Sequence, residues 1–206
     1  MLRKLEDIVD RAKEIADLEN SNYISDKELC FLLNEAYDKV YADLININDR
    51  YYLKTIKVAG PEVVLPEDFF VLSQVMTNFT PIPRKPNTVN SGSFSGYYYD
   101  LNKDRLKIYG NYAGHITIEY YPVLEPIVWP ISTLEPITDI DLPNNIAFSY
   151  FCYVMAMKMK MKQGADFQAI QVLASEQLET YIQLQHRDQY GSTRVGNIYN
   201  NAGFIA

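Results

Sequence analysis

Two neighbouring carboxylates, Glu67 and Asp68, are residues whose type and spacing could support acid–base chemistry. A glycosidase uses such a pair, with one carboxyl group as the acid and the other as base or nucleophile. The pair follows Val64-Leu65-Pro66, and a proline at this place fits the first turn of a helix. Carboxylates are favoured there by the positive end of the helix dipole. A helix start therefore explains Glu67 and Asp68 better than a catalytic pair does.

The histidines and cysteines show no spacing that suits a metal site. His115 and His186 are far apart in the sequence, and neither stands at ligand spacing from Cys30 or Cys152. Both cysteines lie in apolar segments with helical spacing, which is typical of small buried side chains, and they give no disulfide framework. A phosphate-binding Gly-Lys-Ser/Thr loop and a dinucleotide glycine fingerprint are also absent from the sequence. We therefore expect no metal, no cofactor and no enzymatic activity.

Methionine and lysine alternate from Met157 to Lys162. On a helix, steps of two spread the lysines around the circumference, so they form no basic stripe. Lysines are favourable near a helix C-terminus, and this favours a helix that emerges from the core. The alternative is a methionine-faced subunit contact with lysines at its rim. Its candidate residues are Met155, Met159, Lys158 and Lys162.

The sequence loses its helical periodicity from Gly191 onward. Small and polar residues with a few spaced apolar side chains cannot build a core of their own. Such a segment can become ordered in the groove of a partner. We therefore expect residues 191–206 to be an extended docking tail that binds a partner. Its candidate partner-binding residues are Val195, Ile198, Tyr199, Phe204 and Ile205.

Length and composition indicate a globular chain of moderate size. The 206 residues are 48% hydrophobic and 22% charged, and they include 17 tyrosines but one tryptophan. The formal net charge of −7 argues against a general grip on nucleic acid, which depends on clustered Lys and Arg. The longest apolar run is shorter than the ~20 residues that span a bilayer. We expect a soluble protein, made in the cytoplasm, without a targeting segment.

Helical periodicity appears before and after a central block with strand-like alternation. Apolar residues at steps of three and four predict helices over 2–19, 26–45, 143–163 and 166–188. Ser25 and Glu28 form the sequence pattern of a capping box, and Gly164 is a suitable C-terminal stop.

The central block, residues 51–121, is rich in Tyr, Pro and Gly and predicts an antiparallel β meander. Within this block, the residues from Phe69 to Val75 fit a short helical turn that leads into a strand through Phe79.

The predicted fold is α+β: an antiparallel four-helix bundle with an inserted antiparallel β subdomain and an extended C-terminal tail. The helical bundle comprises residues 1–48 and 139–190, the β-rich insertion residues 49–138, and the docking tail residues 191–206.

Several short segments, in this order and spacing, resemble head-to-tail connector (adaptor) proteins of tailed bacteriophages. They span nearly the whole chain: Ser25–Leu29, Leu33–Tyr37, Leu65–Phe69, Ile118–Tyr121 and Asp141–Pro143. The resemblance implies a helical-bundle subunit of a ring, usually dodecameric, that lies beneath the portal. DNA would pass through the channel of this ring without specific binding, which suits the acidic charge.

The resemblance also implies the partners and the location. The partners would be the portal protein, a downstream tail or neck protein and further copies of the chain, with no membrane involved. The large tyrosine-rich block resembles the versions from short-tailed phages, in which it reaches toward tail components. The protein would be made in the host cytoplasm and reside in the neck or connector region of the virion.

Two other functions remain open at this point. A small α+β module that binds a peptide and regulates a partner would fit the same composition. A cell-wall glycan hydrolase would need the carboxylates of the chain to act as acid and base.

Overall fold

The computed structural model describes residues 2–19, 23–77, 80–84, 98–102, 105–109, 115–128 and 139–198, with backbone alone for Tyr98, Asn102 and residues 188–198. The chain divides into two compact units. We call Met1–Ile47 with Pro126–Ala206 the helical unit, and Asn48–Glu125 the β unit. The β unit is thus inserted into the chain of the helical unit. It ends earlier than the predicted insertion over residues 49–138.

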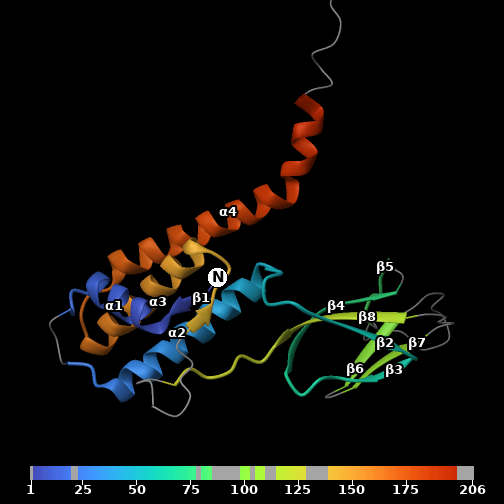
Figure 1. The fold of residues 1–206 in the computed structure, drawn as a ribbon, viewed down its shortest axis with the longest axis horizontal. Helices are drawn as coiled ribbons and strands as arrows, with labels where there is room; N and C mark the ends of the chain where they lie inside the picture. Colours follow the sequence, from blue (N-terminus) through green and yellow to red (C-terminus); the bar gives the residue numbers. More distant parts are fainter. Residues whose placement is uncertain are drawn as a thin grey trace, which may run out of the picture. The chain divides into compact units, whose positions relative to one another are not determined.

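The helical unit contains four helices and two short strands among its described residues (Figure 1). In chain order they are β1 (Leu2–Lys4), α1 (Leu5–Ile15), α2 (Asp26–Asn46), β9 (Asp139–Asp141), α3 (Asn145–Gln163) and α4 (Gln168–Ile198).

Helix α3 is the centre of this unit. Helices α1, α2 and α4 each pack against α3, and no pair among those three makes comparable contact in the described part of the chain. A helix that is contacted from several sides must be apolar around most of its circumference. The buried residues of α3 meet this requirement: Ala147, Tyr150, Phe151, Cys152, Val154, Met155, Ala156 and Met159.

The predicted antiparallel four-helix bundle with an inserted β subdomain is therefore wrong. In a four-helix bundle every helix packs against two neighbours around a shared core. Here α3 is the single helix that the others share, and strands form three separate antiparallel sheets, one of them within the helical unit itself. An apolar stripe indicates a buried face of a helix, but it does not specify which helix covers that face.

The N-terminus is a strand where a helix was predicted. Strand β1 pairs antiparallel with β9, with Arg3 opposite Ile140. This ladder precedes α1, which begins at Leu5 and ends at Ile15, inside the predicted range of 2–19. The stripe of α1 is buried as expected from its spacing, through Leu5, Ile8, Val9 and Ala12.

Local capping residues fix the ends of α2 and α3. The Ser25 side chain accepts a hydrogen bond from the Glu28 N–H while Glu28 accepts one from the Ser25 N–H, which confirms the capping box. The Asn144 side chain caps α3 by accepting from the N–H groups of Ile146 and Ala147. Gly164 ends α3 at φ 68°, a left-handed conformation that glycine adopts without steric cost.

Helix α4 is longer than predicted. Its backbone is helical from Gln168 to Ile198, a length of 31 residues, whereas the sequence predicted an end near residue 188. The expectation of an extended chain from Gly191 is wrong as far as Ile198. Residues 199–206 lie outside the described part.

The β unit consists of two antiparallel sheets. The four-stranded sheet has the order β2-β8-β4-β5 and the three-stranded sheet the order β3-β7-β6. Their strands are β2 (Lys54–Ala59), β3 (Glu62–Val64), β4 (Phe69–Thr77), β5 (Thr80–Pro81), β6 (Tyr98–Asn102), β7 (Arg105–Tyr109) and β8 (His115–Pro122).

One apolar cluster joins the two sheets. Leu106 and Ile108 of β7 are buried between exposed residues, as the period of two requires, and Ile116 and Ile118 of β8 are buried with them. Val63 of β3 belongs to the same cluster, so both sheets contribute to a single core.

The segment Leu65-Pro66-Glu67-Asp68-Phe69 does not begin a helix. The Phe69 N–H donates to the Pro66 carbonyl at 3.0 Å, and β4 starts at Phe69 itself. Proline is compatible with a turn as well as with a helix start, and the β-branched and aromatic residues that follow favour a strand. The prediction of a helical turn from Phe69 is therefore wrong.

Candidate interaction site

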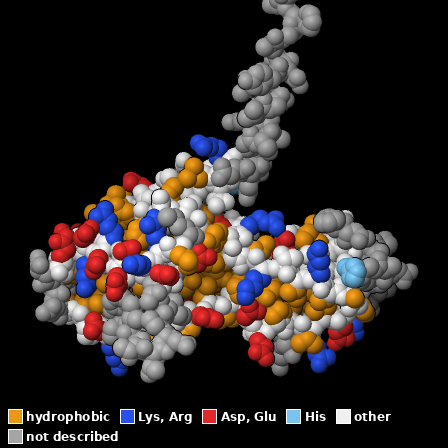
Figure 2. Space-filling view, in the orientation of Figure 1, with side chains coloured by type: hydrophobic (Ala, Val, Ile, Leu, Met, Phe, Trp, Pro, Cys, Tyr) orange, Lys and Arg blue, Asp and Glu red, His pale blue; other side chains and the backbone are white. Residues whose placement is uncertain are grey.

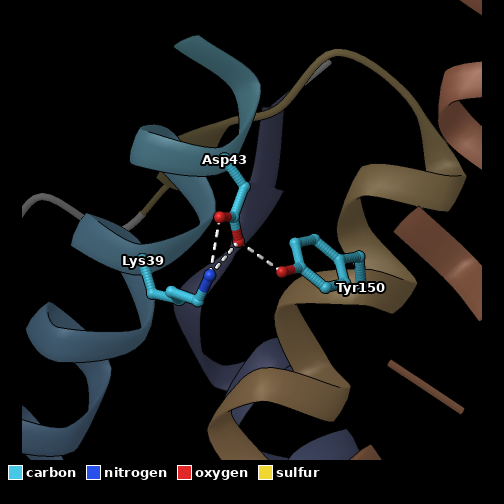
Figure 3. A network of polar contacts seen from close by, with 3 residues as sticks. All are labelled: Lys39, Asp43 and Tyr150. Atoms are coloured by element: carbon cyan, nitrogen blue, oxygen red, sulfur yellow. Dashed lines mark hydrogen bonds and ion pairs between the residues drawn. The ribbon is translucent and has the colours of Figure 1, made fainter. Parts of the chain in front are cut away.

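A buried polar contact connects α2 to the central helix α3 (Figure 3). The Tyr150 hydroxyl donates to Asp43 Oδ2 at 2.5 Å, and Lys39 Nζ lies 2.6 and 2.7 Å from the two carboxylate oxygens. Tyr150 comes from α3, whereas Lys39 and Asp43 are one turn apart on α2. The Asp43 side chain is 12% exposed and that of Lys39 52%, so the charge of the lysine stays in contact with water.

The contact between Tyr150 and Asp43 has a structural role. Burial, and secondly the hydrogen bond to Asp43, raises the pKa of Tyr150 far above its ordinary value. The hydroxyl therefore stays protonated and remains a donor to the carboxylate. Because buried polar groups are costly without partners, this arrangement fixes the position of α2 along α3.

Three lysines near the end of α3 form ion pairs, two of them with α2 and one with the turn after α1. Lys158 pairs with Glu35 on α2 at 3.1 Å, and Lys162 pairs with Glu28 on the first turn of α2 at 3.0 Å. Lys160 lies 3.6 Å from Asp17, which follows α1. Lys158 and Lys162 are one turn apart on the same face of α3 and both reach α2, whereas Lys160, two residues from each, points elsewhere and reaches Asp17.

The burial and ion pairs of α3 argue against the predicted subunit contact. Met155 and Met159 are fully buried in the core of the helical unit, so neither is available to a neighbouring subunit. Lys158 and Lys162 are engaged within the chain by Glu35 and Glu28. The methionine-faced contact is therefore wrong for the two methionines, because their side of α3 faces the other helices.

Glu28 has two roles at the start of α2. It accepts the capping hydrogen bond from Ser25 N–H and also pairs with Lys162. These contacts, the Ser25 N–H first, lower the pKa of Glu28 from 4.5 to about 2. The same pair raises the pKa of Lys162.

The segment that leads back from the β unit is held on α2 by a side-chain amide. Asn34 Nδ2 donates to the Ile127 carbonyl at 2.8 Å, and the Ile127 N–H donates to Asn34 Oδ1 at 2.8 Å. The Cys30 thiol also contacts the Ile127 carbonyl, at 3.5 Å. Asn34 thus pairs with Ile127 as a neighbouring strand would, and Ile127 is buried.

Large apolar side chains are exposed on the helical unit, among charged residues (Figure 2). Phe31 on α2 is 64% exposed and Met161 on α3 is 51% exposed. On α4, Val172 is 57% and Leu173 is 40% exposed. Single exposed apolar residues are common on protein surfaces, whereas groups of them mark candidate interaction sites.

In the β unit, a buried carboxylate lies on β8. Glu119 accepts hydrogen bonds from Arg50 at 2.8 Å and from Gln74 at 2.5 Å, and its side chain is 7% exposed. The neighbouring Tyr121 hydroxyl donates to the Asp49 carbonyl at 2.8 Å. Residues 49 and 50 therefore cover the outer face of β8 and partner its polar groups.

The predicted carboxylate pair Glu67–Asp68 is split between two environments. Asp68 accepts from Lys54 at 2.6 Å and from the Tyr120 hydroxyl at 3.0 Å, whereas Glu67 is exposed. The hydrogen bond from Lys54 lowers the pKa of Asp68. Asp68 thus joins β2 and β8 to the turn before β4, which is a structural role.

Histidine and cysteine residues do not converge on a site. His115 begins β8 and His186 lies on α4, so they belong to different units. Burial raises the pKa of the Cys152 thiol to about 12, which keeps it protonated and unreactive. Among the described residues, no group of three His, Cys, Asp or Glu side chains could hold a metal ion. Nor does any helix in that part have the length and apolar character to cross a membrane.

The predicted tail residues fall at the end of α4 or beyond it. Val195 and Ile198 lie on the helical backbone of α4, and their side chains are outside the described part. Tyr199, Phe204 and Ile205 also lie outside it. Their role in partner binding stays a prediction.

Comparison with known proteins gives no family assignment. No protein-family model matches the sequence, and no curated protein matches it. The functional argument therefore rests on the residues and contacts described above.

Proposed function

We propose that this chain is a structural virion protein of a tailed bacteriophage, a subunit of a ring that joins the portal vertex to the tail. DNA passes through the channel of the ring without specific binding, and the partners are the portal protein, a downstream tail or neck protein and other copies of the chain. The order of its short motifs, which resembles that of head-to-tail connectors, supports this proposal. The formal charge of −7 suits a channel that must release DNA.

The observation that carries the proposal is the length of α4. Helix α3 has 19 residues and α4 has 31, and α3 is the element against which α4 packs most extensively. At 1.5 Å per residue, α4 is roughly 18 Å longer than α3. The C-terminal part of α4 extends beyond α3 (Figure 1), which makes it a candidate surface for a partner. Val195 and Ile198 lie in that continuation, and Tyr199, Phe204 and Ile205 follow it.

Portal capture tests the proposal. The full chain is mixed with purified portal rings, separated by size-exclusion chromatography and imaged by negative-stain electron microscopy. We expect the chain to elute with the portal and to add a ring of density at one end of it. A chain that never elutes with portal rings contradicts the proposed function.

A truncated chain tests the role of the C-terminal segment. Deletion of residues 191–206 should lower the helical circular dichroism signal only by the contribution of residues 191–198, which end α4, yet abolish stable capture. Val64→Ser serves as a control, because it removes an exposed apolar side chain from the β unit and should leave capture unchanged. Undiminished capture by the truncated chain would remove the tail from the proposal.

A further inference from the structure

Two exposed patches on the helical unit differ in composition and match each other in charge. We call Lys27, Phe31 and Met161 the α2–α3 patch, and Val172, Leu173, Glu176 and Glu179 the α4 patch. Each contains two large apolar side chains that are 40% to 64% exposed. The α2–α3 patch has Lys27 at one edge, with the exposed Asp38 two turns further along α2 beyond Phe31, whereas the α4 patch has two carboxylates; only the Lys27 edge therefore matches the α4 patch in charge.

The α2–α3 patch is held in place by ion pairs. Glu28, Phe31 and Glu35 are spaced by three and four residues, so they lie on one face of α2. The pairs of Glu28 with Lys162 and of Glu35 with Lys158 connect this face to the stretch of α3 that contains Met161. The turn of α2 that carries Phe31 is therefore held against α3 before and after this residue, so its backbone needs little ordering on binding.

Lys27 supplies the charge of this patch. It is exposed, stands one turn before Phe31 on α2, and has no ion pair within the described residues. Its ammonium group is therefore available to a carboxylate from outside the chain.

The α4 patch lies on the side of α4 that faces away from α3. Among the described side chains of α4, Ile170, Ala174 and Tyr181 are buried, and they lie on the opposite side of the helix from Val172 and Glu176. Glu176 and Glu179 are exposed, and neither carboxylate has a partner in the part of the chain that the structure describes. Along α4, an apolar pair is thus followed by two free negative charges.

We propose that copies of the chain associate head to tail, with the α4 patch of one copy docked on the α2–α3 patch of the next. Phe31 and Met161 supply the apolar surface for Val172 and Leu173, and Lys27 faces Glu176 and Glu179. A second copy fits because the chain itself carries both halves of the contact, with opposite charges beside the apolar residues. The charges select the register of docking, while apolar burial supplies most of the affinity.

The symmetry of this contact follows from its composition. A contact between two different patches leaves one free patch on each partner, so it repeats until a ring closes. The inference rests on the proposed function only for the closure of the ring. The contact itself is measured without a portal.

Charge exchange is the first test, with dissociation constants measured by sedimentation velocity from micromolar to millimolar concentration. Lys27→Glu alone and Glu176→Lys with Glu179→Lys should each weaken self-association about tenfold, because each places like charges together. The triple variant restores opposite charges and should return to within about threefold of the wild type. Lys57→Glu, at an exposed lysine of the β unit, is the control for Lys27→Glu, because both substitutions change the net charge by the same amount.

Mixing two inactive variants is the second test. Phe31→Asp disables one patch and Leu173→Asp the other, so neither variant alone should self-associate. Their mixture retains one intact patch of each kind and should form a one-to-one dimer that grows no further. Circular dichroism checks that both variants are folded.

Several results would overturn the docking of these patches. They are a wild type that stays monomeric at millimolar concentration, a triple variant without rescue, or a mixture without dimers. A monomeric wild type that portal rings still capture would refute the patch contact and leave the proposed function intact. Patch association without portal capture would do the reverse.

Discussion

Asp43 accepts the buried hydrogen bond that joins α2 to α3. It accepts from Tyr150 and pairs with Lys39, but the two partners differ in exposure. Removing the Tyr150 hydroxyl deletes one charge-assisted hydrogen bond, whereas removing the carboxylate leaves a buried hydroxyl without its acceptor. We expect Tyr150→Phe to lower the free energy of unfolding by about 1.5 kcal/mol and Asp43→Ala by about 3 kcal/mol, measured by urea denaturation.

Lys39→Met is the matched control for this pair of variants. Its ammonium group is exposed, and exposed ion pairs contribute less than about 1 kcal/mol. The expected order of destabilisation is Asp43→Ala, then Tyr150→Phe, then Lys39→Met. A neutral Tyr150→Phe variant would show that the hydrogen bond adds nothing to stability.

The contacts of Glu28 make the free energy of unfolding depend on pH. Its folded pKa of about 2 lies below its ordinary 4.5, so the unfolded chain binds the proton more readily than the folded chain does. The stabilisation is therefore complete above pH 4.5 and is lost as the pH falls toward about 2. Glu28→Gln should be less stable than the wild type at pH 6, and the difference should shrink on acidification. Urea midpoints between pH 6 and pH 2 measure this, and a difference independent of pH would contradict it.

Residues that interact within one helical turn could be predicted from the sequence, and distant partners could not. Ser25 and Glu28 are three residues apart, so the capping box was visible as a pattern, and the structure confirms it. Tyr150 and Asp43 are 107 residues apart, and no periodicity relates them. For Met159, the sequence indicated an apolar residue on a helix but gave no sign of what covers it.

At the scale of elements, Gly164 sets the turn between α3 and α4. Its φ of 68° is left-handed, and an added Cβ would meet no heavy atom within 4 Å. The cost of Gly164→Ala is therefore conformational, and we expect a loss of about 1 kcal/mol in the free energy of unfolding. Gly164→Asn should lose less, since asparagine tolerates this conformation better. Equal losses for the two variants would point to another cause.

Asn34 holds the returning segment against α2. Asn34→Ala leaves the N–H and the carbonyl of the buried Ile127 without their partner, so we expect a loss of about 1–3 kcal/mol. Asn46→Ala, an exposed position at the end of the same helix, is the control and should be close to neutral. Thermal unfolding followed by circular dichroism compares the two. Similar stability of both variants would show that the amide bridge is dispensable.

Two similar Leu-Pro segments show why the type of the following element was predicted correctly in one case and wrongly in the other. Leu142-Pro143 precedes α3, where Asn144 caps the helix and the predicted start was within two residues. Leu65-Pro66 precedes a turn and β4, although the local residues look alike. What distinguishes them is the pairing of β4 with β8, which lies far along the chain. A local motif limits the possible structures, and tertiary pairing selects one of them.

At the scale of the molecule, each unit has its own buried core. Leu33 is 0% exposed in the helical unit, and Ile118 is 0% exposed in the cluster of the β unit. Leu33→Ala and Ile118→Ala should each cost roughly 2–5 kcal/mol. Hydrogen exchange followed by mass spectrometry should show lost protection mainly within the unit that carries the substitution. Equal loss throughout the chain would mean that the two units unfold as one.

The division of the chain was easier to predict than the architecture of its parts. The change from steps of three and four to steps of two near Asn48 coincides with the start of the β unit. The arrangement of helices around α3 could not be predicted, because apolar residues on several sides of α3 fit several packings. The hydrogen bond of Asn34 to Ile127, 93 residues away, is likewise invisible without the fold.

The hydrogen bond from Tyr121 to Asp49 bears on whether the β unit can be replaced by another domain. It joins the last strand of the β unit to the second residue of that unit, so the beginning and the end of this unit's chain are in contact. The helical unit holds its two connections further apart, because Ile127 is bonded to Asn34 while Ile47 lies 13 residues further along α2, roughly 20 Å away at 1.5 Å per residue. A domain that replaced residues 48–125 would therefore need linkers that span about this distance, and a tight turn would not reach. A graft that respects this span could exchange the β unit and retain the helices.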